Sequence, residues 1–171
     1  LYKLRIETDN LRKLRVANTE YILSECIKAV ERYQGRVGCN TLRANIMVLK
    51  GDKLPIVASY GMANSPDKGV VFSKGQGCCG EAYESGEVTV GDLESVYRDT
   101  WDETRRESGR VPWGINKEHF EKTYGLKSVF SMPLIRGEDR VPRGILNIDD
   151  RVSLAIARFQ DQELIALIQG Y

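Results

Sequence analysis

The sequence is poor in the residues that most metal sites and hydrolytic sites need. Its 171 residues include a single histidine, His119, which excludes metal sites and catalytic triads built on several imidazoles. Four cysteines, at positions 26, 39, 78 and 79, lack the CxxC spacing of a zinc site. No apolar run approaches the roughly 18 residues of a membrane-spanning helix. Because 25 basic residues almost balance 24 acidic ones, the net charge of +1 excludes a strongly basic nucleic-acid-binding domain.

The length and composition predict one globular domain. A chain of this size buries its own core, and a hydrophobic fraction of 42% is typical of globular proteins. The chain begins with leucine and ends within a helical pattern over 163–169, so we expect it to be part of a longer protein. Its first ten residues are charged and do not resemble a secretory signal. Together with the cysteine usage, this predicts a cytoplasmic domain, and the sequence leaves open whether the parent protein is anchored to a membrane.

The first 34 residues contain neither glycine nor proline and predict one long helix. Leu4, Leu11, Leu14 and Tyr21 fit heptad positions, which favours pairing with another helix. Over 21–33 the apolar face widens, which favours packing onto a core. We therefore expect a signalling or linker helix over 1–20, a homodimer formed through it, and a separate domain over 21–171. The alternative is a terminal helix that pairs with no second chain.

The remaining chain alternates between strand patterns and short helices. Strands are predicted at 41–49, 54–60, 69–73, 87–90, 128–135 and 144–149, with a short helix over 78–85 and a final helix starting at Ser153. Residues 92–127 form a charged insert that carries Trp101, Trp113, Phe120 and Tyr124, and we expect one or two short helices there that cap the sheet. Hairpins on both sides of the insert predict an α+β domain with one central antiparallel sheet.

Residues 75–80, Gly-Gln-Gly-Cys-Cys-Gly, match the G-x-G-x-x-G pattern of dinucleotide-binding folds. The helix that follows ends after about two turns at Gly86, which is too short for a parallel crossover. We therefore interpret the glycines as a tight turn packed against the sheet. The free amides at 77–79, at the start of that helix, are still able to hold an anionic group of a ligand.

Taken in order, four segments resemble the GAF domain family. They are the strand at 42–49, the turn at 75–77 with Gly80 and Gly86, the strand at 125–134 and the strand at 144–149. The resemblance implies a six-stranded antiparallel sheet flanked by helices, behind a long N-terminal helix. It also implies a sensor module for an unidentified small molecule, dimeric through its terminal helices and fused to an output domain in the parent protein.

The known subclasses of that family differ in the residues they use. Bilin-binding members attach the chromophore through a cysteine, and the insert here has none. Members that bind cyclic nucleotides carry Asn-Lys-Phe-Asp-Glu, whereas this chain has Asn-Lys-Glu-His-Phe at 116–120. Members that reduce free methionine sulfoxide use several cysteines around the pocket, a spacing that Cys78 and Cys79 do not match. We therefore predict that the domain is not an enzyme, and the cofactor stays unknown.

The predicted ligand site lies between the sheet and the insert. Aromatic side chains of the insert are candidates to contact a flat ligand, and the simpler alternative is that they form a core beneath the insert. Polar side chains on the central strands, and the glycine turn with its two cysteines, complete the site. The candidate residues are Gly77, Cys78, Cys79, Trp101, Trp113, Tyr124, Ser131 and Asn147.

Two alternative functions stay open at this point. Cys78 and Cys79 also suit a redox sensor, because a thiol at a helix N-terminus has a lowered pKa and reacts faster. The other alternative is a module without a ligand that only dimerises and transmits a signal.

Overall fold

The computed structural model describes residues 2–95, 114–135, 137 and 140–171, without the side chains of residues 2–7 and 9. Its helices are α1 (Tyr2–Gln34), η1 (Pro66–Gly69, a 3-10 helix), α2 (Gly77–Ser85), α5 (Lys117–Thr123), α6 (Leu154–Ala157) and α7 (Gln162–Gln169). Its strands are β1 (Arg43–Val48), β2 (Lys53–Leu54), β3 (Ile56–Tyr60), β4 (Phe72–Ser73), β5 (Thr89–Asp92), β6 (Ser128–Ile135) and β7 (Pro142–Asp150). This arrangement confirms the predicted α+β class and the long first helix.

Five strands form one antiparallel sheet in the order β3-β1-β7-β6-β5. The predicted sheet had six strands. The difference arises at 69–73, where the strand is reduced to β4 and pairs with β2 in a separate two-stranded sheet. The chain passes from one sheet to the other at Pro55, which lies between β2 and β3 and has no N–H to donate.

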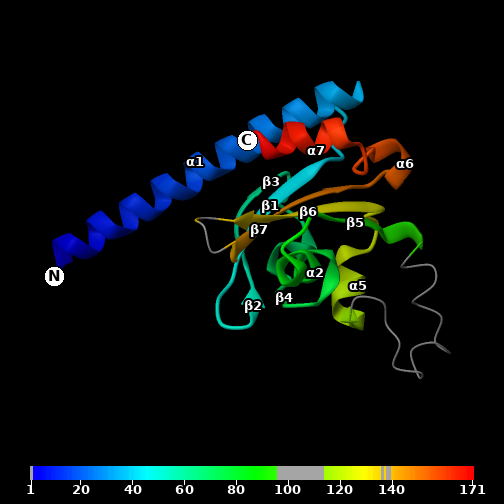
Figure 1. The fold of residues 1–171 in the computed structure, drawn as a ribbon. Helices are drawn as coiled ribbons and strands as arrows, with labels where there is room; N and C mark the ends of the chain where they lie inside the picture. Colours follow the sequence, from blue (N-terminus) through cyan, green and yellow to red (C-terminus); the bar gives the residue numbers. More distant parts are fainter. Residues whose placement is uncertain (1, 96–113, 136, 138–139) are drawn as a thin grey trace.

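The two faces of the sheet are covered by different helices. α1 and α7 lie on one face, and α2 and α5 lie on the other (Figure 1). The core under α1 and α7 takes alternate residues of the central strands, as the alternating pattern at 41–49 predicts, and includes Ala44, Phe130 and Ile148. Arg43 and Asn45 of β1, and Asn147 and Asp149 of β7, therefore point to the α2 face.

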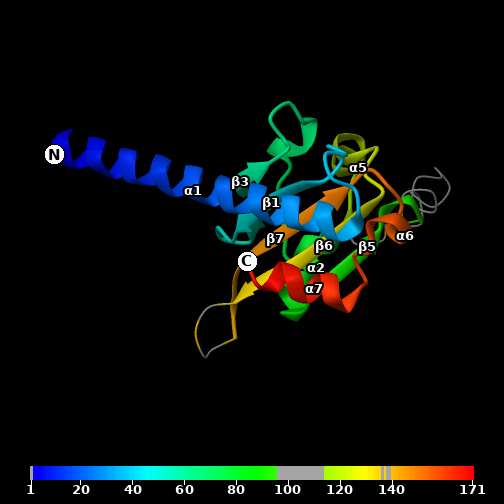
Figure 2. The same cartoon turned by 90° about the horizontal axis from the view of Figure 1, so that it is seen from above.

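The N-terminal half of α1 extends away from the sheet (Figure 2). On it, Leu11 and Leu14 are each 58% exposed. The side chain of Leu4 lies outside the description. Within the residues that the structure describes, no helix has both the length and the apolar character needed to cross a membrane. Pairing of α1 with a second copy, and the division of the chain at residues 20 and 21, stay predictions.

The predicted C-terminal helix is broken into α6 and α7. Arg158 adopts a left-handed conformation with φ of 54°, which ends α6, and Phe159 then enters the core. Asp161 starts α7 by accepting a hydrogen bond from the amide of Glu163. Ser153 precedes α6 as predicted, but its side chain makes no capping bond there.

Side-chain contacts fasten the end of α1 to the C-terminal helices and to the sheet. The hydroxyl of Tyr33 donates to Asp161 at 3.0 Å. Just beyond α1, the guanidinium of Arg36 donates to the buried carboxylate of Asp150, the last residue of β7, at 2.6 Å. These contacts join the end of α1 to the start of α7 and to the end of β7.

Candidate functional site

A cavity of about 70 Å³ lies on the α2 face of the sheet. It is several times larger than the ~10–15 Å³ that one water molecule needs. The sheet forms its floor, the first turn of α2 forms one wall, and η1, β4 and residues 115–126 form the others. The lining residues are Asn45, Met47, Ile56, Met62, Asp67, Val70, Phe72, Gly77, Cys78, Cys79, Leu93, Ile115, Thr123, Leu126, Val129, Asn147 and Asp149.

A row of buried polar side chains crosses the floor of the cavity. Asn147 lies opposite Asn45 on one neighbouring strand and opposite Ser131 on the other. The hydroxyl of Ser131 donates to Asn147 Oδ1 at 2.6 Å, and Asn147 Nδ2 donates to Asn45 Oδ1 at 3.0 Å. Because these groups satisfy each other, the sheet centre tolerates their burial.

Beside this row, one arginine holds two buried carboxylates. Arg43 Nη2 donates to Asp67 Oδ2 and its Nε donates to Asp149 Oδ1, each at 2.6 Å. The hydroxyl of Ser65 donates a hydrogen bond to Asp67 Oδ1 and accepts one from Arg43 Nη1 at 2.5 Å. The cluster fastens η1 to the sheet and places both carboxylates at the cavity.

The cluster leaves one carboxylate oxygen open. Asp149 is 4% exposed, and it bonds Arg43 through Oδ1. Within the described part of the chain, every buried side-chain nitrogen and oxygen has a partner. Oδ2 of Asp149 has no partner among these residues, so it is not fully enclosed, and because Asp149 lines the cavity we infer that Oδ2 faces it. Burial raises the pKa of Asp149 to about 6, although Arg43 opposes the shift.

The glycine motif at 75–80 serves close packing. Gly77 has φ of +66°, and a Cβ there would meet the ring of Phe72 at 2.9 Å. A Cβ on Gly80 would lie 2.4 Å from the carbonyl oxygen of Ser73. The sheet beside the motif is antiparallel, as the short helix predicted, so the motif is not that of a dinucleotide-binding fold.

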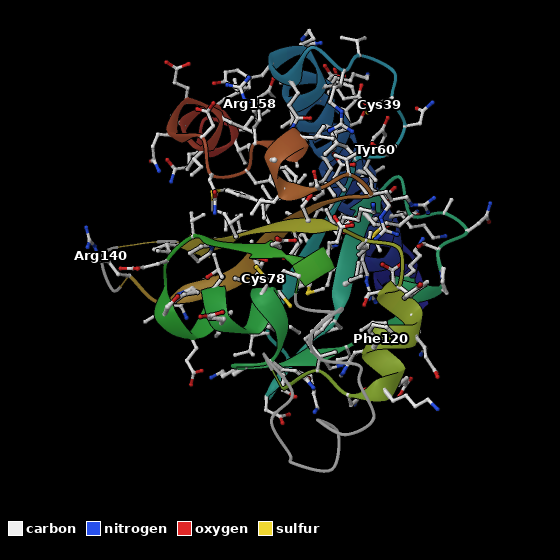
Figure 3. The ribbon with its side chains drawn as sticks, turned by 90° about the vertical axis from the view of Figure 1, so that its right-hand side faces the viewer. Cys39, Tyr60, Cys78, Phe120, Arg140 and Arg158 are labelled. Carbon is white, nitrogen blue, oxygen red and sulfur yellow. The ribbon has the colours of Figure 1, made fainter. Side chains whose placement is uncertain are left out.

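The first turn of α2 carries Cys78 and Cys79 into the cavity wall. Figure 3 shows Cys78 on α2, on the side of the sheet away from Arg158. The lowered thiol pKa expected from the helix N-terminus is wrong. Burial instead raises the pKa of Cys78 to about 12, and it raises the pKa of Cys79 further. Both thiols are free and protonated near neutral pH.

We expect this burial to make both thiols unreactive in the native protein. Near pH 8, iodoacetamide should modify the partly exposed Cys39 roughly 100-fold faster than Cys78 or Cys79, because only the thiolate attacks. Peptide mass spectrometry after timed quenching measures each rate. In urea all the cysteines should react alike. Native modification of Cys78 or Cys79 as fast as Cys39 would show an activated thiol.

His119 is a structural residue next to the cavity. Its backbone amide donates to Asn116 Oδ1 at 2.9 Å, which caps the start of α5. Its ring stacks on Phe72 with centroids 4.8 Å apart. Nδ1 accepts from the amide of Asn116 at 3.4 Å, and Nε2 lies 3.2 Å from the carbonyl oxygen of Val71.

The structure brings together half of the predicted site residues. Gly77, Cys78, Cys79 and Asn147 line the cavity. Ser131 lies one strand away and orients Asn147. Tyr124 is 75% exposed, lies outside the lining and packs on Phe120. Trp101 and Trp113 lie outside the described residues.

The sequence reasoning missed Arg43, Asp67 and Asp149. A signal for two of them was present, because Arg43 and Asp149 occupy strand positions that alternate with the apolar core residues and share the face of Asn45 and Asn147. Charged residues inside predicted central strands indicate either a solvated face or a buried pair. The topology decides between these, because β1 and β7 are neighbours in the middle of the sheet.

Solved structures show what the fold resembles. The structures similar to this chain include the type II free methionine-R-sulfoxide reductase from Thermoplasma acidophilum (14% identity, 94% of this chain and 96% of that chain, TM-score 0.53). They also include the nlh2 GAF domain of A. aeolicus in an inactive state (21%, 94% and 94%, TM-score 0.50). A third is fRMsr of Staphylococcus aureus in complex with its substrate (19%, 94% and 90%, TM-score 0.51). No family model matches the sequence, and no curated protein matches it.

The chain has the GAF fold. Several GAF domain structures share its architecture, which confirms the resemblance read from the four sequence segments. The prediction that the domain is not an enzyme is wrong. Several proteins with this same fold are free methionine-R-sulfoxide reductases, so the fold is compatible with enzyme activity. The spacing of Cys78 and Cys79 does not decide the question.

Proposed function

We propose that the domain is a regulatory module that binds a small molecule in the cavity on the α2 face. The observation that supports this most is the cavity itself, where a buried polar row and an open carboxylate oxygen lie among apolar walls. Such concave sites with a few oriented polar groups are the usual form of a ligand pocket. A purely structural core would be better served by apolar side chains at these positions.

The proposed relay runs through the end of β7. Asp149 and Asp150 are consecutive, so their side chains point to opposite faces of the sheet. Asp149 reaches the cavity and Asp150 pairs with Arg36 next to α1. A ligand that moves Asp149 would therefore shift the anchor of α1. Through the exposed Leu11 and Leu14 of α1, we propose, the change passes to a second copy and to a fused output domain.

A thermal-shift screen against metabolite classes (amino acids, nucleotides, organic acids, amines) tests the proposal. A ligand at 100 times its Kd adds about 2.7 kcal/mol to the free energy of unfolding, which corresponds to a rise in Tm of about 5–10 °C for a chain of this size. Hydrogen exchange should then slow at residues 31–39 as well as at the cavity. A screen without any stabilising compound would contradict the proposal.

Two matched variants locate the binding. Val129→Phe fills the cavity and should abolish the shift, while Val57→Phe makes the same change at an exposed position of β3 and should retain it. The Tm of each variant without a ligand checks that it folds. An equal shift in both variants would place the ligand elsewhere.

A redox role is the second candidate. Cys78 and Cys79 lining the cavity favour it, since a ligand with an oxidised sulfur would lie beside two thiols. The raised thiol pKa values weigh against it. The alkylation rates described above decide between the two candidates.

A further inference from the structure

The charges around the cavity do not balance. Among the described lining residues, Asp67 and Asp149 are the charged ones. Arg43 is their shared partner, so the buried group of three carries one positive and two negative charges when both carboxylates are ionised. Isolated buried charges are costly, and a site with this composition favours any group that supplies a further positive charge.

The open oxygen shows where that charge would sit. Both oxygens of Asp67 already accept hydrogen bonds from Arg43, and Oδ1 of Asp149 does the same. Oδ2 of Asp149 is open to the cavity, and its residue is 4% exposed. Asp149 is therefore a largely buried residue whose Oδ2 is left as a free acceptor at the cavity.

We propose that the cavity takes a small ligand with a protonated amine and an apolar body, the ammonium donating to Oδ2 of Asp149. This rests on the proposed function, because it names the ligand class of the same cavity. The apolar body would contact Met47 and Val129 on the floor of the cavity and Val70 and Leu126 on its walls. Hydrogen bonds between charged groups in a desolvated site are stronger than those between neutral groups. The site should therefore prefer an amine over an uncharged ligand of the same shape.

The same arrangement predicts how binding depends on pH. Asp149 is surrounded by Arg43 on β1, Asp67 on η1 and Asp150 on β7, and Asp150 is itself paired with Arg36. Burial raises the pKa of Asp149 to about 6. A cation binds the carboxylate and not the protonated acid, so its affinity should rise severalfold between about pH 5.5 and pH 7.5, where an alkylamine stays charged.

Three probes of one shape test the proposal by calorimetry on the wild-type protein: isopentylamine, isopentyl alcohol and isovalerate. The amine should bind at least about tenfold more tightly than the alcohol near pH 7.5, and the carboxylate should bind most weakly. The advantage of the amine should shrink near pH 5.5. Equal binding of amine and alcohol, or a preference for isovalerate, would overturn the amine while leaving the cavity as a ligand site. Absence of binding by all three would overturn it and count against the proposed function as well.

Two variants assign the effect to Asp149. Asp149→Asn keeps the shape and removes one charge, so amine and alcohol should bind it equally. Glu121→Gln removes the same charge from the exposed face of α5 and should keep the wild-type preference. Persistence of the amine preference in Asp149→Asn would overturn the assignment, and the wild-type comparison stands even if that variant is poorly folded.

Discussion

Replacing Arg43 by methionine should lower the free energy of unfolding by about 3–5 kcal/mol near pH 8. The substitution keeps most of the side-chain volume but leaves Asp67 and Asp149 buried, close together and without their shared cation. Burial already raises the pKa of Asp149, and without the opposing cation it should rise further. The folded variant then holds protons more tightly, so part of the lost stability should return as the pH falls toward 5.

Urea unfolding followed by circular dichroism at the two pH values measures this effect. Arg151→Met is the matched control, because Arg151 is exposed just after β7, and it should change the free energy of unfolding by less than about 0.5 kcal/mol. Equal losses for Arg43→Met at both pH values would show that Arg43 matters through packing and not through its charge.

Phe159→Ala should cost about 3–5 kcal/mol of stability. Phe159 is fully buried at the corner between α6 and α7, and its ring centroid lies 6.0 Å from that of Phe130 on β6. Its removal leaves a cavity between the terminal helices and the sheet, on the face opposite the proposed ligand site. The same denaturation measurement gives the loss.

Ile156→Ala serves as the control for this second change, because Ile156 is an apolar residue of α6 that is more than half exposed. The free energy of unfolding of Ile156→Ala should lie within about 0.5 kcal/mol of the wild-type value. A loss below about 1 kcal/mol for Phe159→Ala would mean that the corner between α6 and α7 collapses to fill the space.

The fold was largely accessible from the sequence because local patterns determine it. Alternating apolar residues predict β1, β6 and β7, and the absence of glycine and proline predicts α1. The break between α6 and α7 was not accessible. Arginine is not a residue type that favours the left-handed conformation, so the sequence does not indicate it at Arg158. The turn depends on the burial of Phe159, which is a tertiary contact.

The candidate site was accessible only in part. Cys78 and Asn147 were found because a glycine turn and a polar residue in a strand stand out locally. The cluster of Arg43, Asp67 and Asp149 joins residues 24 and 106 positions apart in the chain, so no local window contains it. The thiol pKa was misjudged for the same reason, since the burial that raises it comes from distant elements.

The polar row at the cavity floor also fixes the register of the sheet. A slip of β7 by one residue along β1 would turn Asn147 into the core beside Phe130 and leave the amide of Asn45 facing an apolar side chain. Misaligned sheets therefore carry unpaired amides and are penalised during folding. Substitutions at Asn45, Ser131 or Asn147 that adapt the cavity to a new ligand would also weaken the preference for the correct strand register. The ligand specificity of the domain should therefore change more readily through residues of the cavity walls than through these residues of the floor.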